Sequence, residues 1–155
     1  MAAEASPPEP LQGLRWTAPV PREARGDHIV SLQADDEAVG QEPLRSIIEA
    51  LHELLGDLDT LAVVAGEVEM QLAWYPGGSQ GYIRHTDADP DDGCLVVGRP
   101  RQRLFTAICY CNSDWQPGDG GELRLWPPGN GGGSLDIEPK AGRLALFLSG
   151  CVPHE

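Results

Sequence analysis

The spacing of apolar residues changes partway along this 155-residue chain, and that change limits the fold more than any other feature. Between residues 43 and 59 the apolar residues recur every three or four positions, which predicts one amphipathic helix. Its apolar stripe consists of Leu44, Ile47, Ile48, Leu51, Leu54, Leu55 and Leu58. Over residues 68–74, apolar and polar residues alternate instead, which predicts a half-buried strand.

Further short apolar runs follow, separated by glycine- and proline-rich turns. They cover residues 82–87, 104–111, 122–126, 135–137 and 143–149. No helical pattern separates these later runs, which argues against a parallel βαβ arrangement and favours a β-sandwich or small barrel. Residues 1–25 are rich in proline and lack periodicity, so we expect a flexible leader there and one folded domain over residues 26–155.

The composition excludes several kinds of partner. Eleven Lys and Arg against twenty-four Asp and Glu give a net charge of −13, which argues against binding to nucleic acid or to an anionic membrane. No apolar run is long enough to span a bilayer, and no secretory signal is visible. We therefore expect a cytoplasmic and/or nuclear protein whose four cysteines are reduced, with Cys109 and Cys111 as small buried residues.

The densest polar cluster surrounds His85 and Asp87. Residues two apart on a strand point to the same face, so this imidazole and this carboxylate are expected side by side. Together they make two-thirds of the 2-His-1-carboxylate set that binds Fe(II), and His154 is the only histidine downstream that could complete it. So short a motif is weak by itself, and an ion-paired histidine on a surface strand is the alternative interpretation. A calcium loop starting at Asp87 is rejected, because Asp92 and Gly98 occupy the positions that need Gly and Glu.

Six segments together resemble a known family in order and spacing. They are residues 75–87 (YPGGSQGYIRHTD), 110–115 (YCNSDW), 120–127 (GGELRLWP), 136–140 (DIEPK), 142–147 (GRLALF) and 153–155 (PHE). Over roughly residues 25–155 the chain resembles the Fe(II)- and 2-oxoglutarate-dependent prolyl 4-hydroxylases. Within that family it is most similar to the intracellular oxygen-sensing branch, which acts on hypoxia-inducible factor.

The resemblance implies a mainly β fold with an N-terminal helix, a double-stranded β-helix or jelly roll. The metal ligands that it implies for Fe(II) are His85, Asp87 and His154. It further implies ascorbate as a reductant and, as partner, an intracellular protein that contains a target proline. Residues 26–155 would then form the dioxygenase domain, and the chain would hydroxylate a prolyl residue.

The same resemblance implies roles for three further residues. Tyr110 and Tyr75 would line the 2-oxoglutarate pocket, and Arg103 would lie near the peptide substrate. Considered as residues alone, both tyrosines could instead be ordinary core aromatics that bury a ring and keep one polar atom available.

The resemblance also leaves one family feature unmatched. In the family, a further strand after the distal histidine carries an arginine that pairs with 2-oxoglutarate, whereas this sequence ends at Glu155. The expectation is therefore a jelly roll whose last strand is missing and an activity impaired by truncation, since losing a charged hydrogen-bond partner costs about 1.5–3 kcal/mol. The alternative is a non-catalytic jelly-roll binding module or an inactive fragment.

Overall fold

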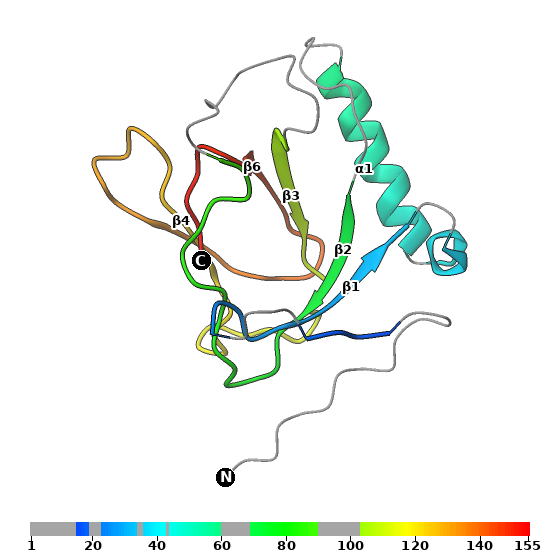
Figure 1. The fold of residues 1–155 in the computed structure, drawn as a ribbon, viewed down its shortest axis with the longest axis horizontal. Helices are drawn as coiled ribbons and strands as arrows, with labels where there is room; N and C mark the ends of the chain where they lie inside the picture. The colour runs from blue at the N-terminus through cyan, green and yellow to red at the C-terminus, as the bar shows by residue number, and fades with distance from the viewer. Residues whose placement is uncertain (1–14, 19–22, 34–35, 43, 60–68, 90–102) are drawn as a thin grey trace. The chain divides into compact units, whose positions relative to one another are not determined.

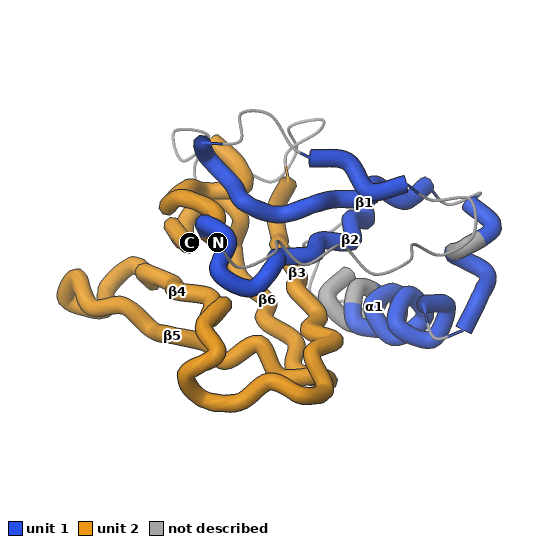
Figure 2. Tube along the Cα trace, turned by 90° about the horizontal axis from the view of Figure 1, so that it is seen from below, with its two compact units in different colours: residues 1–80 blue, residues 81–155 orange. Residues whose placement is uncertain are grey.

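The computed structural model describes residues 15–18, 23–33, 36–42, 44–59, 69–89 and 103–155 (Figure 1). The chain divides into two compact units, Met1–Gln80 and Gly81–Glu155 (Figure 2). Within the described residues, strands predominate over a single α-helix and one short 3-10 helix. None of the helices in these ranges is both long and apolar enough to cross a membrane.

The first unit is built on one antiparallel strand pair. Strand β1 (His28–Leu32) pairs with β2 (Met70–Trp74), with His28 opposite Trp74 (Figure 1). Between these strands the chain forms the 3-10 helix η1 (Glu37–Gly40) and then α1 (Leu44–Asp59). The core of this unit joins β1 to α1, and its buried members are Val30, Leu32, Leu44 and Ile48.

Helix α1 confirms the helix predicted between residues 43 and 59. Its two core residues, Leu44 and Ile48, belong to the apolar stripe because positions four apart share one face of a helix. The helix follows strand β1, however, so an N-terminal placement of the helix is not confirmed. Strand β1 itself is not predicted from the sequence, because its five residues form too short a pattern and it pairs with a strand far along the chain.

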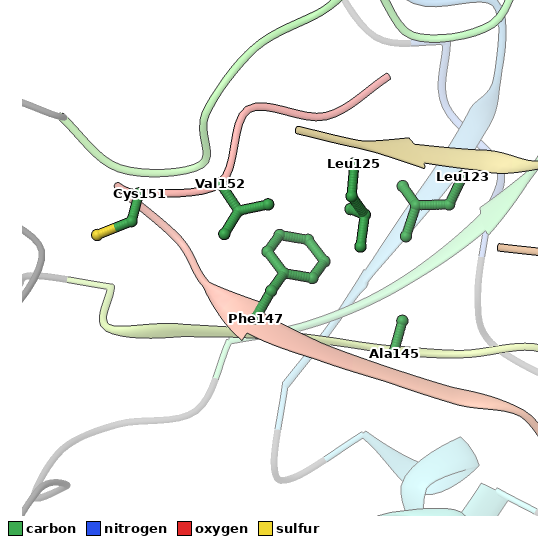
Figure 3. Close-up of a cluster of buried hydrophobic side chains, with 6 residues drawn as sticks. All are labelled: Leu123, Leu125, Ala145, Phe147, Cys151 and Val152. Atoms are coloured by element: carbon green, nitrogen blue, oxygen red, sulfur yellow. The ribbon is translucent and has the colours of Figure 1, made fainter. Parts of the chain in front are cut away.

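The second unit contains two antiparallel strand pairs. Strand β3 (Phe105–Cys109) pairs with β6 (Leu144–Leu148), and β4 (Leu123–Leu125) pairs with β5 (Leu135–Ile137). Buried side chains of β4, β6 and the turn after β6 form the core (Figure 3), namely Leu123, Leu125, Ala145, Phe147, Cys151 and Val152. The Phe147 ring reaches from β6 to between Leu125 and Val152 in that view. This mainly β arrangement agrees with the expected jelly roll.

Four of the five strands predicted beyond residue 80 are confirmed, three of them with shortened ends, but the strand predicted over residues 82–87 is not. In that segment only His85 makes a β-bridge, and its partner is His154. The backbone amides of Asp87 and Ala88 both donate to the carbonyl oxygen of Ser149, at 3.0 and 3.3 Å. Two successive amides aimed at one acceptor interrupt the alternating pattern of a strand ladder, so pairing stops there.

The cysteines differ from expectation. Cys109 and Cys111 are free thiols but are exposed, because the alternation of β3 turns Ile108 toward the core and Cys109 away from it. Cys151 lies in the core and is disulfide-bonded, so the expectation of four reduced cysteines is wrong at this position. The expected leader, residues 1–25, falls largely outside the described residues.

Among the described glycines of the first unit, Gly26 lies closest to another part of the backbone, which generates a testable prediction. A Cβ atom there would lie 1.9 Å from the carbonyl oxygen of Gln80. We expect Gly26→Ala to lower the free energy of unfolding by about 1–3 kcal/mol, because the backbone must move to relieve the overlap. Chemical denaturation followed by circular dichroism measures the change.

Gly40→Ala is the matched control for this prediction. A Cβ at Gly40 meets no heavy atom within 4 Å, so we expect a change within about 0.5 kcal/mol. Equal stability of the two variants would contradict the packing that the structure assigns to Gly26.

Candidate metal centre

Three segments of the second unit bring the predicted triad together. The amide of His85 donates to the carbonyl of His154 at 2.9 Å, and the amide of His154 donates back to the carbonyl of His85 at 2.8 Å. On its other side, the segment that carries His154 pairs with the β4 strand region through Arg124 and Glu155. The residues around His154 are thereby held between the His85 segment and β4. Asp87 and His154 therefore lie close in space although 67 positions separate them in the sequence.

The side chains of the triad converge. One potential ligand atom from each of His85, Asp87 and His154 lies within 4.8 Å of the others. Nε2 of His85 is 3.4 Å from Oδ1 of Asp87, and Nε2 of His154 is 3.7 Å from Oδ2 of the same carboxylate. His154 is buried and the other two are half-buried, so the donors form a partly enclosed cluster.

Both imidazoles are oriented by their other ring nitrogen. Nδ1 of His85 lies 2.7 Å from the carbonyl of Ile83, and Nδ1 of His154 lies 3.1 Å from the carbonyl of Val152. A carbonyl can only accept, so each Nδ1 carries the proton and Nε2 is left as the nitrogen that faces Asp87. Rings of Tyr82 and Phe147 contact these imidazoles at centroid distances of 3.6 and 4.8 Å.

This arrangement fits a bound metal ion. A neutral imidazole whose Nδ1 is protonated presents a lone pair on Nε2. Two such lone pairs that face the Asp87 carboxylate repel this carboxylate unless a cation lies between them. That cation is either a proton on the ring or a metal ion. Burial lowers the pKa of His154 below its usual 6.5, which disfavours the protonated ring. Two imidazole nitrogens and a carboxylate oxygen are the donor set of the 2-His-1-carboxylate sites.

Asp87 stays ionised despite its partial burial. Burial raises its pKa, but the neighbouring His85 ring, the hydrogen bond from the Thr106 hydroxyl and the nearby Arg103 guanidinium outweigh this effect and hold the pKa at about 2. Thr106 is a residue that the sequence reasoning missed. Its only signal is a polar residue within the apolar run of β3, and a threonine there is common in strands whatever their function.

The three other predicted site residues are placed differently. Nη1 of Arg103 lies 3.9 Å from Oδ1 of Asp87, with a largely exposed side chain. Tyr110 packs against the core cluster that includes Phe147, and Phe147 in turn contacts the His154 ring. Tyr75 belongs to the first unit, where it is exposed rather than a core aromatic. The structure therefore places Arg103 close to Asp87 and packs Tyr110 against the core, and the roles of all three residues stay predictions.

Tyr110 generates a prediction about pH. Burial raises the pKa of its phenol from 10.0 to about 12, so the stability that depends on the neutral phenol is complete below pH 10 and is lost as the pH rises toward 12. Tyr110→Phe has no phenol to ionise, and we expect its free energy of unfolding to fall less over this interval than that of the wild type. Urea denaturation across the interval measures this. Equally steep losses in the two proteins would contradict the burial of the phenol.

Comparison with known proteins gives a consistent result. The model of the 2OG-Fe(II) oxygenase superfamily matches residues 70–155. Egl nine homolog 1 of Homo sapiens is 33% identical over 140 residues, covering 86% of this chain and 30% of the relative. The hypoxia-inducible factor prolyl hydroxylase of Caenorhabditis elegans is 38% identical over 94 residues, covering 59% of this chain and 12% of that protein. The chain thus spans about a third of the length of Egl nine homolog 1 and less of the nematode relative.

Two solved structures extend the comparison. A prolyl-4-hydroxylase of Pseudomonas putida has a TM-score of 0.69 and 33% identity, covering 92% of this chain and 68% of that one. A prolyl hydroxylase of Trichoplax adhaerens, in complex with an oxygen-degradation-domain peptide of hypoxia-inducible factor, has a TM-score of 0.58 and 31% identity, covering 84% of this chain and 56% of the other. The family match over residues 70–155 includes all three converging ligands, and the chain belongs to the 2-oxoglutarate- and Fe(II)-dependent oxygenase superfamily.

Proposed function

We propose that this chain is a prolyl hydroxylase that uses Fe(II) and 2-oxoglutarate to hydroxylate a proline of a protein substrate. The observation that carries the proposal is the convergence of two imidazoles and one carboxylate, from segments far apart in sequence, within 4.8 Å. The relatives support the reaction class, because both solved structures are prolyl hydroxylases at 31–33% identity. Membership in the superfamily supplies the cofactors, Fe(II) and 2-oxoglutarate.

In this proposal the iron is held by His85, Asp87 and His154. The bound metal, with 2-oxoglutarate and O₂, supplies the oxidising chemistry that no side chain can provide. The chain's own residues orient the ligands: Nδ1 of each histidine is committed to a backbone carbonyl, which leaves each Nε2 on the side of Asp87. Three protein ligands leave further coordination positions for 2-oxoglutarate and O₂.

Tyr110 is proposed to bind 2-oxoglutarate, together with Tyr75. The raised pKa of Tyr110, about 12, keeps its phenol neutral at any physiological pH, so it can donate a hydrogen bond to a carboxylate. Arg103 is proposed to contact the peptide substrate. Its exposed guanidinium lies close to Asp87, which would set a positive group beside the reacting centre in a chain whose net charge is −13.

Further parts of the proposal concern the setting of the reaction. The Trichoplax relative holds a peptide, which favours a protein substrate, and we propose neither a nucleic-acid nor a membrane partner. Ascorbate is proposed as the reductant that keeps the iron ferrous. We also propose residues 26–155 as the catalytic domain after a leader, and a cytoplasmic or nuclear location. The free thiols of Cys109 and Cys111 favour that location, whereas the disulfide of Cys151 does not.

Metal binding provides the first test. Anaerobic titration of the purified chain with Fe(II) and 2-oxoglutarate should produce the visible charge-transfer band of the chelated cosubstrate, and the band should saturate. His85→Ala should abolish the band, because two ligands no longer define the site. His52→Ala is the matched control and should titrate like the wild type, since His52 is an exposed residue of α1. Stoichiometric binding by His85→Ala would show that the ligands are wrongly assigned.

Turnover provides the second test, and it separates the enzyme from the non-catalytic binding module. With Fe(II), 2-oxoglutarate, ascorbate and air, a proline-containing peptide should gain one oxygen atom while succinate accumulates in equal amount. Mass spectrometry of the peptide and quantification of succinate measure both products. A chain that shows the charge-transfer band but forms no succinate with any prolyl peptide would be a binding module rather than a hydroxylase.

A further inference from the structure

A pair of hydroxyl groups lies behind the Asp87 carboxylate. Oγ1 of Thr106 is 2.6 Å from Oδ2 of Asp87 and 2.8 Å from Oγ of Ser149. Thr106 lies on β3, whereas Ser149 directly follows β6 and is completely buried. The antiparallel pairing of these strands sets Thr106 opposite Phe147, two residues before Ser149, which brings both hydroxyls to the same end of the sheet.

The direction of these hydrogen bonds follows from the donor inventory. An ionised carboxylate only accepts, so Thr106 must donate its single hydroxyl proton to Asp87. Thr106 can then only accept from its other neighbour, so the hydroxyl of Ser149 donates to Thr106. The result is a directed chain, from Ser149 to Thr106 to Asp87, in which neither hydroxyl is free to rotate without losing a partner.

Ser149 also holds the backbone of Asp87. Its carbonyl oxygen accepts from the Asp87 amide at 3.0 Å, and its own amide donates to the carbonyl of Leu104 at 3.0 Å. One buried residue thus fixes Asp87 twice, through the main chain directly and through the side chain by way of Thr106. The other carboxylate oxygen, Oδ1, lies 3.4 Å from Nε2 of His85 and 3.9 Å from Nη1 of Arg103, whereas Nε2 of His154 lies 3.7 Å from Oδ2.

We infer that Thr106 and Ser149 are positioning residues for the metal site, which orient the Asp87 carboxylate so that Oδ1 serves as a single-oxygen ligand. This inference rests on the proposed function, because it assumes that the triad binds Fe(II). The physical reason is that the hydrogen bond to Oδ2 opposes rotation of the carboxylate and discourages two-oxygen binding. Coordination positions then stay open for cosubstrate. Groups that orient a metal ligand in this way typically contribute about 10- to 100-fold to metal affinity or activity.

The test is a titration of the metal-free full chain with Co(II), whose visible absorption reports both affinity and coordination. Thr106→Val keeps the shape and removes both hydrogen bonds, so we expect an affinity about 10- to 100-fold lower and a changed spectrum at saturation. Thr106→Ser keeps the hydroxyl and should restore both properties. Ser149→Ala should lie between the wild type and Thr106→Val, because Thr106 can still donate to Asp87.

Thr17→Val is the matched control. The Thr17 hydroxyl also donates to a single acceptor, the carbonyl of Ile29, but it is exposed and belongs to the first unit. This variant should bind Co(II) like the wild type. Circular dichroism of every metal-free variant verifies folding, and if Thr106→Val does not fold, Ser149→Ala decides the result.

The outcomes separate the two levels of the proposal. A wild type that binds Co(II), together with a folded Thr106→Val of unchanged affinity and spectrum, would overturn the positioning role alone. The same conclusion follows if Thr106→Ser is as impaired as Thr106→Val, since packing and not the hydroxyl would then matter. A folded wild type that binds neither Co(II) nor Fe(II) would overturn the proposed metal site and the positioning role together.

Discussion

The candidate metal centre depends on one pair of backbone hydrogen bonds, those that join His85 and His154. Each residue donates its amide to the other, at 2.9 and 2.8 Å, and this double contact sets the two imidazoles side by side with ring centroids 4.2 Å apart. An isolated two-residue bridge would be weak in water, since a net hydrogen bond contributes only about 0.5–1.5 kcal/mol. It persists here because the segment of His154 is also paired to β4, and because Cys151 and Val152 just before it are part of the core.

The core of the second unit and its site are therefore parts of one arrangement. Phe147 packs between Leu125 and Val152 (Figure 3), and its ring contacts the His154 ring in a T-shaped arrangement. Strand β3, which pairs with β6, carries Thr106, whose hydroxyl donates to Asp87. Ser149, the residue directly after β6, contacts Thr106 in turn. Apolar side chains of β4 and β6 fill the core, while the polar side chains of Thr106 and Ser149 form the hydrogen bonds that reach the metal ligand Asp87. A rigid scaffold that carries its functional groups at strand ends is a common plan for binding sites.

Much of this could be predicted from the chain alone. The switch from helical to alternating periodicity identified α1 and most later strands, because burial of one face imposes a period on any sequence. His85 and Asp87 were identified as neighbours by their spacing of two, although the segment between Tyr82 and Asp87 is not a regular strand. The prediction from this spacing holds because the bridge between His85 and His154 and the carbonyl of Ser149 bring the two side chains together without a regular strand ladder.

The order of residues alone established an inventory: which residues can bind a metal, which stretch is helical, and which family the motifs resemble. The contacts between distant segments became visible only in the folded chain, because backbone pairing leaves no local signature in the residues that it joins. Thr106 and Ser149 are ordinary strand and turn residues until β3 and β6 pair and set them behind Asp87. Likewise, only the fold shows why residue 26 is a glycine, because the backbone of Gln80 leaves no space there for a Cβ atom. The exposure of Cys109 and Cys111 was missed because an apolar run does not reveal which of its faces turns inward.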